Sequence, residues 1–326
     1  MARRYLSAEK FRTAREAAGL TGLELCERAG LRKWTSLPSA IETGKVQNID
    51  RAVLLRFCKV MGVKLSEVLA DYGQAGKWLW PFFSYFGGKW KKALLYPQPR
   101  HSTIVEPFAG SAGYAVRFHQ HNVVLCDIDP VIAGIWEYLI KVSPEEMMGL
   151  PELDGLEGCI SNLDAPQEAK WLMGFWYQRA GHSPTDRAHS WNGLVGTDKA
   201  KATHSIPWPA AKVRLAAQVQ KIRHWKVYNC GFEDCPVEGE ATWFVDPPYQ
   251  SQPDVYSFSV EAVDYERLGK WCKSREGLVI VCENTGADWL PFRHFMTTHS
   301  CHGYEDRGQQ KNREAIWISS EVRSQG

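Results

Sequence analysis

The chain has 326 residues, a length that favours two domains over one. Hydrophobic residues make up 44% and charged residues 23%, a globular composition that excludes collagen-like, disordered and disulfide-scaffold classes. No apolar run approaches the roughly 18–20 residues of a membrane-spanning helix. The sequence turns polar by Ser7, so no signal peptide is predicted. Nine cysteines without a CxxC pair indicate a reduced, cytoplasmic protein.

Charge is unevenly distributed along the chain. The formal net charge is +2, but residues 1–70 hold 13 Lys and Arg against 7 Asp and Glu, and the remainder is net negative. A basic small domain beside an acidic larger one predicts that the small domain binds a polyanion.

Residues 7–70 read as a compact bundle of short helices. Helices are predicted after Ser7, Thr21 and Asp50, whose side chains can cap helix N-termini, and Gly19 and Gly30 end the first two. Two short helices joined by a tight glycine turn within a basic bundle are typical of helix-turn-helix DNA-binding domains. A helical bundle that makes protein contacts is the alternative interpretation.

This segment resembles the Cro and phage-repressor type of helix-turn-helix domain. The resemblance is carried by Arg12-Thr-Ala-Arg-Glu-Ala-Ala-Gly-Leu, Leu25-Cys-Glu-Arg-Ala-Gly, Ile41-Glu-Thr-Gly-Lys and Gly62-Val-Lys-Leu-Ser-Glu-Val-Leu. The stretch 31–40 runs longer than in that type, and Pro38 stands where the recognition helix is expected. Proline in a helix interior costs about 3 kcal/mol, so we expect Pro38 in the first turn of a shortened helix.

Beyond a hinge predicted at Gly73-Gln-Ala-Gly76 the pattern changes to short apolar strands separated by helices. Strands are predicted at 103–107, 123–127, 241–245 and 278–282, and a late strand near the sheet edge at 314–319. Strands that alternate with helices predict a mostly parallel α/β sheet.

A glycine-rich turn follows the first of these strands, in Glu106-Pro-Phe-Ala-Gly110-Ser-Ala-Gly113. Glycines at a strand-to-helix turn let the backbone approach a ligand closely. Asp127 stands nineteen residues after Phe108, at the end of the next predicted strand. A carboxylate there can accept both ribose hydroxyls of a nucleoside. By itself this pattern does not separate NAD from S-adenosylmethionine.

Asp246-Pro247-Pro248-Tyr249 follows the strand 241–245. Two prolines fix the backbone, because proline has no N–H and a locked φ. The Asp246 carboxylate and the Pro247 carbonyl then form two rigid acceptors at the ligand-binding edge of the sheet. Two convergent acceptors suit an exocyclic amine, and Tyr249 supplies a flat face on which a base can stack.

This tetrapeptide is similar to the DPPY motif of N6-adenine DNA methyltransferases, and Phe108-Ala-Gly110 is similar to their FxG motif. Upstream, Ser84-Tyr85-Phe-Gly87-Gly88-Lys89 resembles their N-terminal motif, an aromatic followed by Gly-Gly-Lys. The order of the three motifs is that of the Dam-like, or D12, class, and residues 80–320 carry the resemblance. The chain departs from the FxGxG pattern at Ala112, with Gly113 one position later.

The resemblance implies a Rossmann-like, S-adenosylmethionine-dependent methyltransferase sheet and methyl transfer to an adenine flipped out of duplex DNA. It implies no metal. Its implied cofactor contacts are Tyr85, Lys89, Phe108, Gly110, Asp127 and Asp246, and its implied catalytic residues are Asp246, Pro247, Pro248 and Tyr249. The resulting domains are a helix-turn-helix domain at 1–72, a linker at 73–80 and a methyltransferase domain at 81–326.

Residues 142–235 form an expected insertion, mostly helical, that reads the target DNA. The stretch 187–226 holds eight Lys or Arg against one acid, interleaved with tryptophans. Phosphate contacts depend on such charge. An exposed helical face in solvent is the alternative for 212–226. The candidate DNA-binding residues are Arg187, Trp191, Asn192, Lys199, Lys201, Lys212 and Arg214.

Two other functions compete with adenine methylation. One is methylation of another planar amine, cytosine N4 or RNA adenine, although those N4 enzymes more often carry Ser at the position of Asp246. The other is a DNA-binding regulator whose methyltransferase half is catalytically weak. The intact Asp-Pro-Pro-Tyr sequence argues against the second alternative.

Overall fold

A computed structural model describes residues 8–43, 51–63, 65–68, 79–153, 158–178, 181, 183–187, 208–250, 263–299 and 311–319. The chain divides into two compact units. One unit comprises Met1–Lys77, Ser143–Cys159 and Arg187–Gln218, and the other comprises Trp78–Val142, Ile160–Asp186 and Val219–Gly326. No described helix is long and apolar enough to cross a membrane.

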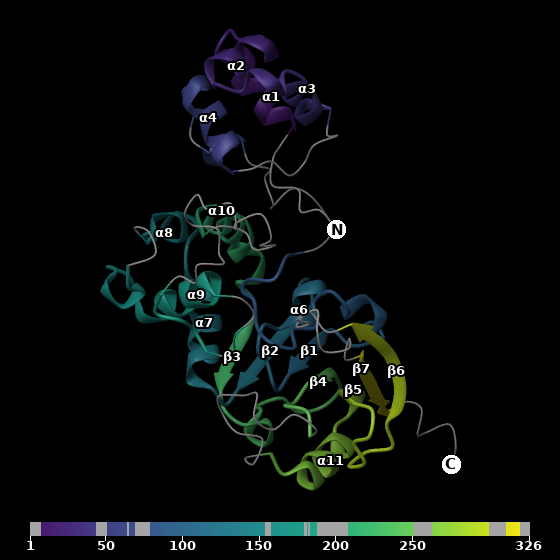
Figure 1. The fold of residues 1–326 in the computed structure, drawn as a ribbon. Coiled ribbons are helices and arrows are strands. Elements are labelled where there is room, and N and C mark those ends of the chain that lie inside the picture. The colour runs from purple at the N-terminus through teal and green to yellow at the C-terminus, as the bar shows by residue number, and fades with distance from the viewer. Residues whose placement is uncertain are drawn as a thin grey trace. The chain divides into compact units, whose positions relative to one another are not determined.

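The N-terminal region is helical, as the sequence predicts (Figure 1). Its elements are α1 (Ala8–Ala17), α2 (Gly22–Arg28), the 3₁₀ turn η1 (Arg32–Trp34), α3 (Leu37–Glu42), α4 (Arg51–Met61) and α5 (Leu65–Val68). The fully buried Phe11 and Phe57 meet edge to face at 5.7 Å, and Leu25 and Ile41 complete this small core. The capping expectation is confirmed at Thr21, which forms a reciprocal capping box with Glu24.

The short helix α3 begins in the way that the sequence predicts. Pro38 occupies its first turn, where the absence of an N–H costs nothing, and the helix has only 6 residues. Eight residues separate Arg28 from Leu37, and three of them form η1. The second helix of the motif is therefore shortened, and the turn before it is long.

The same unit contains two further helices, α8 (Pro144–Gly149) and most of α10 (Trp208–Val219). A capping box between Ser143 and Glu146 starts α8. Trp208 is buried and donates its indole N–H to the Pro151 carbonyl at 2.8 Å. These contacts fix the start of α10 against the segment that follows α8.

The second unit is built on a seven-stranded sheet with the order β3-β2-β1-β4-β5-β7-β6. Strands β1 to β5 are parallel, and β7 is antiparallel to both of its neighbours. This sheet resembles that of Rossmann-like methyltransferases. Its strands are β1 (Thr103–Glu106), β2 (Asn122–Asp127), β3 (Lys226–Asn229), β4 (Ala241–Val245), β5 (Gly277–Asn284), β6 (Arg293–His299) and β7 (Lys311–Ile318).

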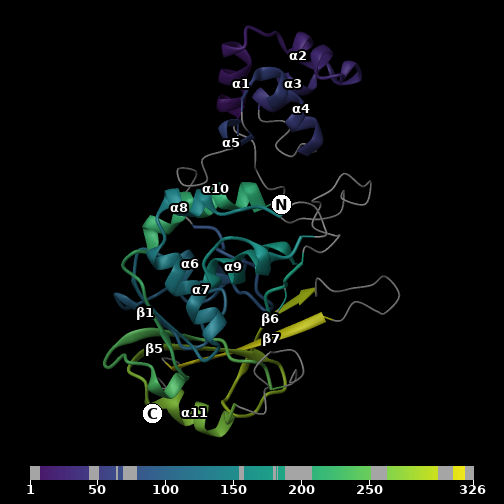
Figure 2. The same ribbon diagram turned by 90° about the vertical axis from the view of Figure 1, so that its left-hand side faces the viewer.

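Helices cover both faces of this sheet (Figures 1 and 2). On one face lie α6 (Gly113–Arg117), α7 (Pro130–Lys141) and α9 (Gln167–Tyr177), and on the other lies α11 (Tyr265–Ser274). Leu268 and Cys272 of α11 pack with Trp243 and Val279 in one core. All five residues of β4 are buried, as a parallel strand covered on both faces requires.

Candidate active site

The site lies where the strand order reverses. From β1 (Thr103–Glu106) the sheet continues through β2 and β3 on one side, and from β4 (Ala241–Val245) it continues through β5 on the other. Such a switch point leaves a crevice at the carboxyl ends of the strands, where open α/β sheets bind ligands. The glycine turn that follows β1 and the Asp246–Tyr249 segment that follows β4 both begin at this edge.

Asp127 ends β2 and faces the glycine turn. Its Oδ2 accepts the Gly110 N–H at 2.9 Å and its Oδ1 accepts the Asp129 N–H at 3.0 Å. Burial raises the pKa of Asp127 to about 6, although both N–H donors act against this. Each carboxylate oxygen keeps a second lone pair for a further donor. The sequence therefore places an acceptor pair beside the turn, as expected from the spacing.

Two residues of the turn have left-handed backbone. Gly110 has φ +44° and Ala112 has φ +46°. A Cβ on Gly110 would lie 3.1 Å from the ring of Tyr85, so this position needs glycine both for its backbone and for its space. Ala112, the departure from the FxGxG pattern, adopts the left-handed conformation that a glycine takes more readily, at a cost of about 1–2 kcal/mol.

The Gly-Gly-Lys segment packs directly on this turn. A Cβ on Gly88 would lie 3.0 Å from the Ser111 Oγ. A Cβ on Gly113, the first residue of α6, would lie 2.5 Å from the Trp90 backbone nitrogen and 2.9 Å from that of Lys89. At Gly113 backbone approaches backbone this closely because the residue has no side chain. Two of the motifs found in the sequence are thus joined by contact.

Lys89 joins them to the third motif. Its ammonium contacts both carboxylate oxygens of Asp246, at 2.7 and 2.8 Å, and also the Gly87 carbonyl at 3.0 Å. Lys89 is 5% exposed and the Asp246 side chain is 19% exposed. Burial alone would lower the pKa of Lys89, but the surrounding acidic groups, Asp246 foremost, together offset it and hold that pKa well above its usual value.

The remainder of the Asp-Pro-Pro-Tyr segment is also held in place. Tyr265 of α11 donates its hydroxyl to the Pro248 carbonyl at 2.8 Å. Among the described residues no donor reaches the Pro247 carbonyl, which remains an available acceptor. Tyr249 is 9% exposed, its hydroxyl has no partner among the described residues, and the Lys89 ammonium lies 4.9 Å from its ring centroid. The sequence led us to expect an open ring face, whereas here a cation covers it.

Phe108, the remaining predicted pocket residue, stacks on Phe232 at 5.8 Å. Two residues that the sequence analysis left without a role also lie at this edge. Ile128 follows Asp127 and is 57% exposed, an isolated apolar surface next to the acceptor. Glu106 ends β1, is 2% exposed and accepts the Ala115 N–H at 2.6 Å, and burial raises its pKa to about 8. The sequence signal that could have identified Ile128 is an apolar residue directly after the acid that ends a predicted strand.

The predicted DNA-binding residues fall into three groups. Lys212 and Arg214 are buried, and the Lys212 ammonium contacts the Leu150 carbonyl at 2.7 Å and Glu152 at 3.0 Å. These two side chains therefore do not lie on the surface, where a phosphate contact requires them. Arg187 is exposed. The remaining candidates lie outside the described residues: Trp191, Asn192, Lys199 and Lys201.

Within the described ranges, no group of three or more His, Cys, Asp or Glu side chains is arranged to hold a metal ion. The sequence matches no known protein-family model and no curated protein. The chemistry of the site therefore rests on the residues described above.

Proposed function

We propose that this protein is a DNA methyltransferase that transfers the methyl group of S-adenosylmethionine to N6 of an adenine flipped out of duplex DNA. One observation carries the proposal. The ion pair between Lys89 and Asp246 joins the Gly-Gly-Lys and Asp-Pro-Pro-Tyr segments at the switch point of the sheet, where the Gly-Gly-Lys segment also packs on the glycine turn. An anionic acceptor that a cation holds at the carboxyl edge of the sheet suits chemistry on a planar amine.

The donor set fits the proposed cofactor, which supplies a methyl group on a positively charged sulfur when bound. Asp127 retains lone pairs for two ribose hydroxyls while backbone N–H groups fix its orientation. The exposed side chain of Ile128 offers an apolar surface to the cofactor's purine. Tyr85, Phe108 and Gly110 would line the remainder of the pocket, and the Lys89–Asp246 pair would border the methyl group.

Asp246 would act on the substrate amine. The lone pair of adenine N6 is delocalised into the ring, so the amino group is a weak nucleophile. Hydrogen bonds from that group to the Asp246 carboxylate and the Pro247 carbonyl favour a tetrahedral nitrogen. The same acceptors would stabilise the positive charge that develops on N6 as the methyl–sulfur bond breaks and the methyl–nitrogen bond forms, and the amine would then release one proton to solvent. Holding N6 about 3–3.5 Å from the methyl carbon supplies the remaining rate enhancement.

Lys89 would exchange partners during this process. Both oxygens of Asp246 accept its ammonium, and the same ammonium covers the ring of Tyr249. An incoming base therefore displaces Lys89 from at least one oxygen and from the ring. Before the amine arrives, Lys89 keeps Asp246 ionised. After the exchange, the freed face of Tyr249 stacks on the base.

The proposal is tested by methyl transfer from labelled S-adenosylmethionine to mixed-sequence duplex DNA. We expect the wild type to label DNA and Asp246→Ala to lose at least about 100-fold in rate, since oxyanion-hole donors of comparable importance cost 10²–10³. The exposed Asp288 in the same unit provides the control, and Asp288→Ala should retain full activity. Absence of transfer by the wild type would favour the regulator instead.

A further inference from the structure

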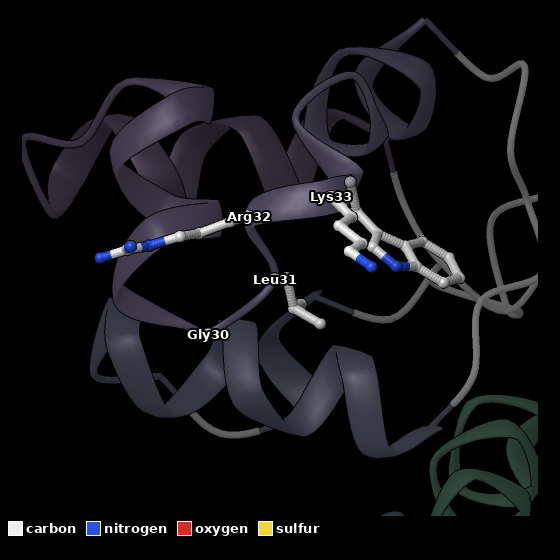
Figure 3. A pocket seen from close by; sticks show the side chains of 5 residues that line it. Gly30, Leu31, Arg32 and Lys33 are labelled. Atoms are coloured by element: carbon white, nitrogen blue, oxygen red, sulfur yellow. The ribbon is translucent and has the colours of Figure 1, made fainter.

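Among the described residues of the N-terminal region, the turn between α2 (Gly22–Arg28) and α3 (Leu37–Glu42) is the longest exposed stretch. Five consecutive residues, 32–36, are all exposed. Gly30, Leu31, Arg32, Lys33 and Trp34 line a hollow of about 460 Å³ at this turn. Figure 3 shows the side chains of Arg32 and Lys33 on opposite sides of Leu31. Trp34 is 50% exposed, and among the described Phe, Tyr and Trp side chains the other exposed one is Tyr228, at 38%.

The turn is nevertheless firmly held. The buried Leu31 and Leu37 anchor its two ends. The backbone N–H of Trp34 donates to the Leu31 carbonyl at 2.8 Å, and the Cys26 thiol donates to the Trp34 carbonyl at 3.3 Å. An exposed indole on a fixed backbone loses little entropy when a ligand stacks on it.

The helix α3 itself offers little to a DNA groove. Its side chains that reach solvent are Ser39, Ala40 and Glu42, and none of them is a cation. Glu42 is engaged with Arg15, whose guanidinium nitrogens lie 2.6 and 3.1 Å from its carboxylate. Major-groove recognition depends mostly on Arg, Lys, Asn and Gln on the recognition element. Arg12 also contacts Glu42, at 3.5 Å, and two further cations lie on the turn before α3.

The two cations on the turn are Arg32 and Lys33. In the described part of the chain neither has an ion-pair partner. Arg32 and Lys33 directly precede the exposed Trp34, so two cations and an aromatic ring share this turn. Cations and exposed aromatic rings together are what proteins use to bind single-stranded nucleic acid, since cations follow the backbone and the ring stacks on a base. In a duplex both faces of a base are already stacked, so an exposed indole gains less there.

We propose that this turn is a binding site for single-stranded nucleic acid, in which Trp34 stacks on an unpaired base and Arg32 and Lys33 contact the flanking phosphates. The site is separate from the residues assigned to methyl transfer and does not depend on that assignment. It also differs from duplex recognition through α3, which the helix-turn-helix resemblance implies.

The test measures binding of a fluorescently labelled oligothymidylate to the full chain by anisotropy, without cofactor. Thymidylate contains no adenine, so the proposed methylation target is absent. We expect Trp34→Ala to weaken binding by about 5- to 150-fold, the range for loss of one base–aromatic stack. Trp34→Phe should retain most of the affinity. Arg32→Ala/Lys33→Ala should weaken binding and reduce the slope of log K against log salt by about 1.4.

A matched control removes the same charge elsewhere in the same region. Arg56 and Lys59 are exposed on α4, and Arg56→Ala/Lys59→Ala should leave the affinity within about twofold and the salt slope unchanged. Equal losses in the two double variants would overturn the proposal, because charge alone would then explain binding. Unchanged binding by Trp34→Ala would also overturn it. A loss by Trp34→Ala confined to duplex DNA would assign the turn to duplex recognition and contradict the single-strand assignment.

Discussion

Replacing Lys89 by methionine tests whether the Lys89–Asp246 pair organises the site. Methionine preserves most of the buried length of the side chain but leaves the Asp246 carboxylate without its cation. Removing one partner of a buried ion pair costs about 3–5 kcal/mol. The Asp246 side chain is 19% exposed, so water retains some contact with it. We therefore expect a loss near the lower limit, about 3 kcal/mol in the free energy of unfolding at pH 7.

The loss should depend on pH. Burial already raises the pKa of Asp246 above its usual value while Lys89 opposes the rise, so removal of Lys89 raises that pKa further. An acid with a raised folded pKa stabilises the fold below its unfolded pKa, and this stabilisation is lost as pH rises through the folded pKa. The deficit of Lys89→Met should therefore shrink between pH 7 and pH 5.

Urea unfolding followed by tryptophan fluorescence at pH 5 and pH 7 provides the measurement. The double variant Lys89→Met/Asp246→Asn should recover most of the lost stability at pH 7, because no buried charge remains. Lys141 is 71% exposed, and among the described residues its ion-pair partner is Glu137 on the same helix. Lys141→Met should therefore change the free energy of unfolding by less than about 0.5 kcal/mol. Equal stability of Lys89→Met and wild type at pH 7, or a deficit that does not change with pH, would refute this reasoning.

Three further predictions concern neighbouring residues. The pKa of Asp127 is raised to about 6, so its ionised form is lost as pH falls below that value. Below pH 6 the affinity for S-adenosylmethionine, measured by calorimetry, should decline about tenfold per pH unit. An affinity that does not change with pH would contradict the role of Asp127 in binding the cofactor. Glu106 has a pKa of about 8, so wild-type stability should fall as pH rises from about 4.5 to 8, and Glu106→Gln should flatten that fall in urea titrations. A Cβ at Gly113 would meet backbone, whereas one at Gly231 would meet nothing within 4 Å. Gly113→Ala should therefore lower the free energy of unfolding by about 1–3 kcal/mol, and Gly231→Ala should not lower it. Equal melting curves for the two variants would count against close packing of the Lys89 segment.

The sequence predicts the central strands because they are buried on both faces. The apolar runs at 241–245 and 278–282 correspond to β4 and β5 (Gly277–Asn284). The edge strands β3 (Lys226–Asn229) and β6 (Arg293–His299) escaped prediction. Three of the four residues of β3 are exposed, so its sequence carries no apolar pattern. An edge strand is defined by pairing with its neighbour, which a local pattern does not reveal.

The charged insertion illustrates a second limit. A run of Lys and Arg predicts an exposed basic surface, but Lys212 contacts the Leu150 carbonyl, 62 residues earlier in the chain. A partner so distant in sequence is visible only in the folded structure. Conversely, the glycines that the motifs share do meet a structural need, because a Cβ at Gly113 would collide with backbone and one at Gly88 or Gly110 would make a tight contact.

Nucleoside analysis of DNA methylated by the purified protein tests the central claim most directly. Duplex DNA is incubated with S-adenosylmethionine and either wild type or Asp246→Ala, digested to nucleosides and resolved by mass spectrometry. If the Asp246 carboxylate and the Pro247 carbonyl hold an adenine amino group, the wild type will yield N6-methyldeoxyadenosine and the variant almost none. Methyl groups on cytosine N4, or equal N6-methyladenine from both proteins, would contradict the assignment of this site to adenine.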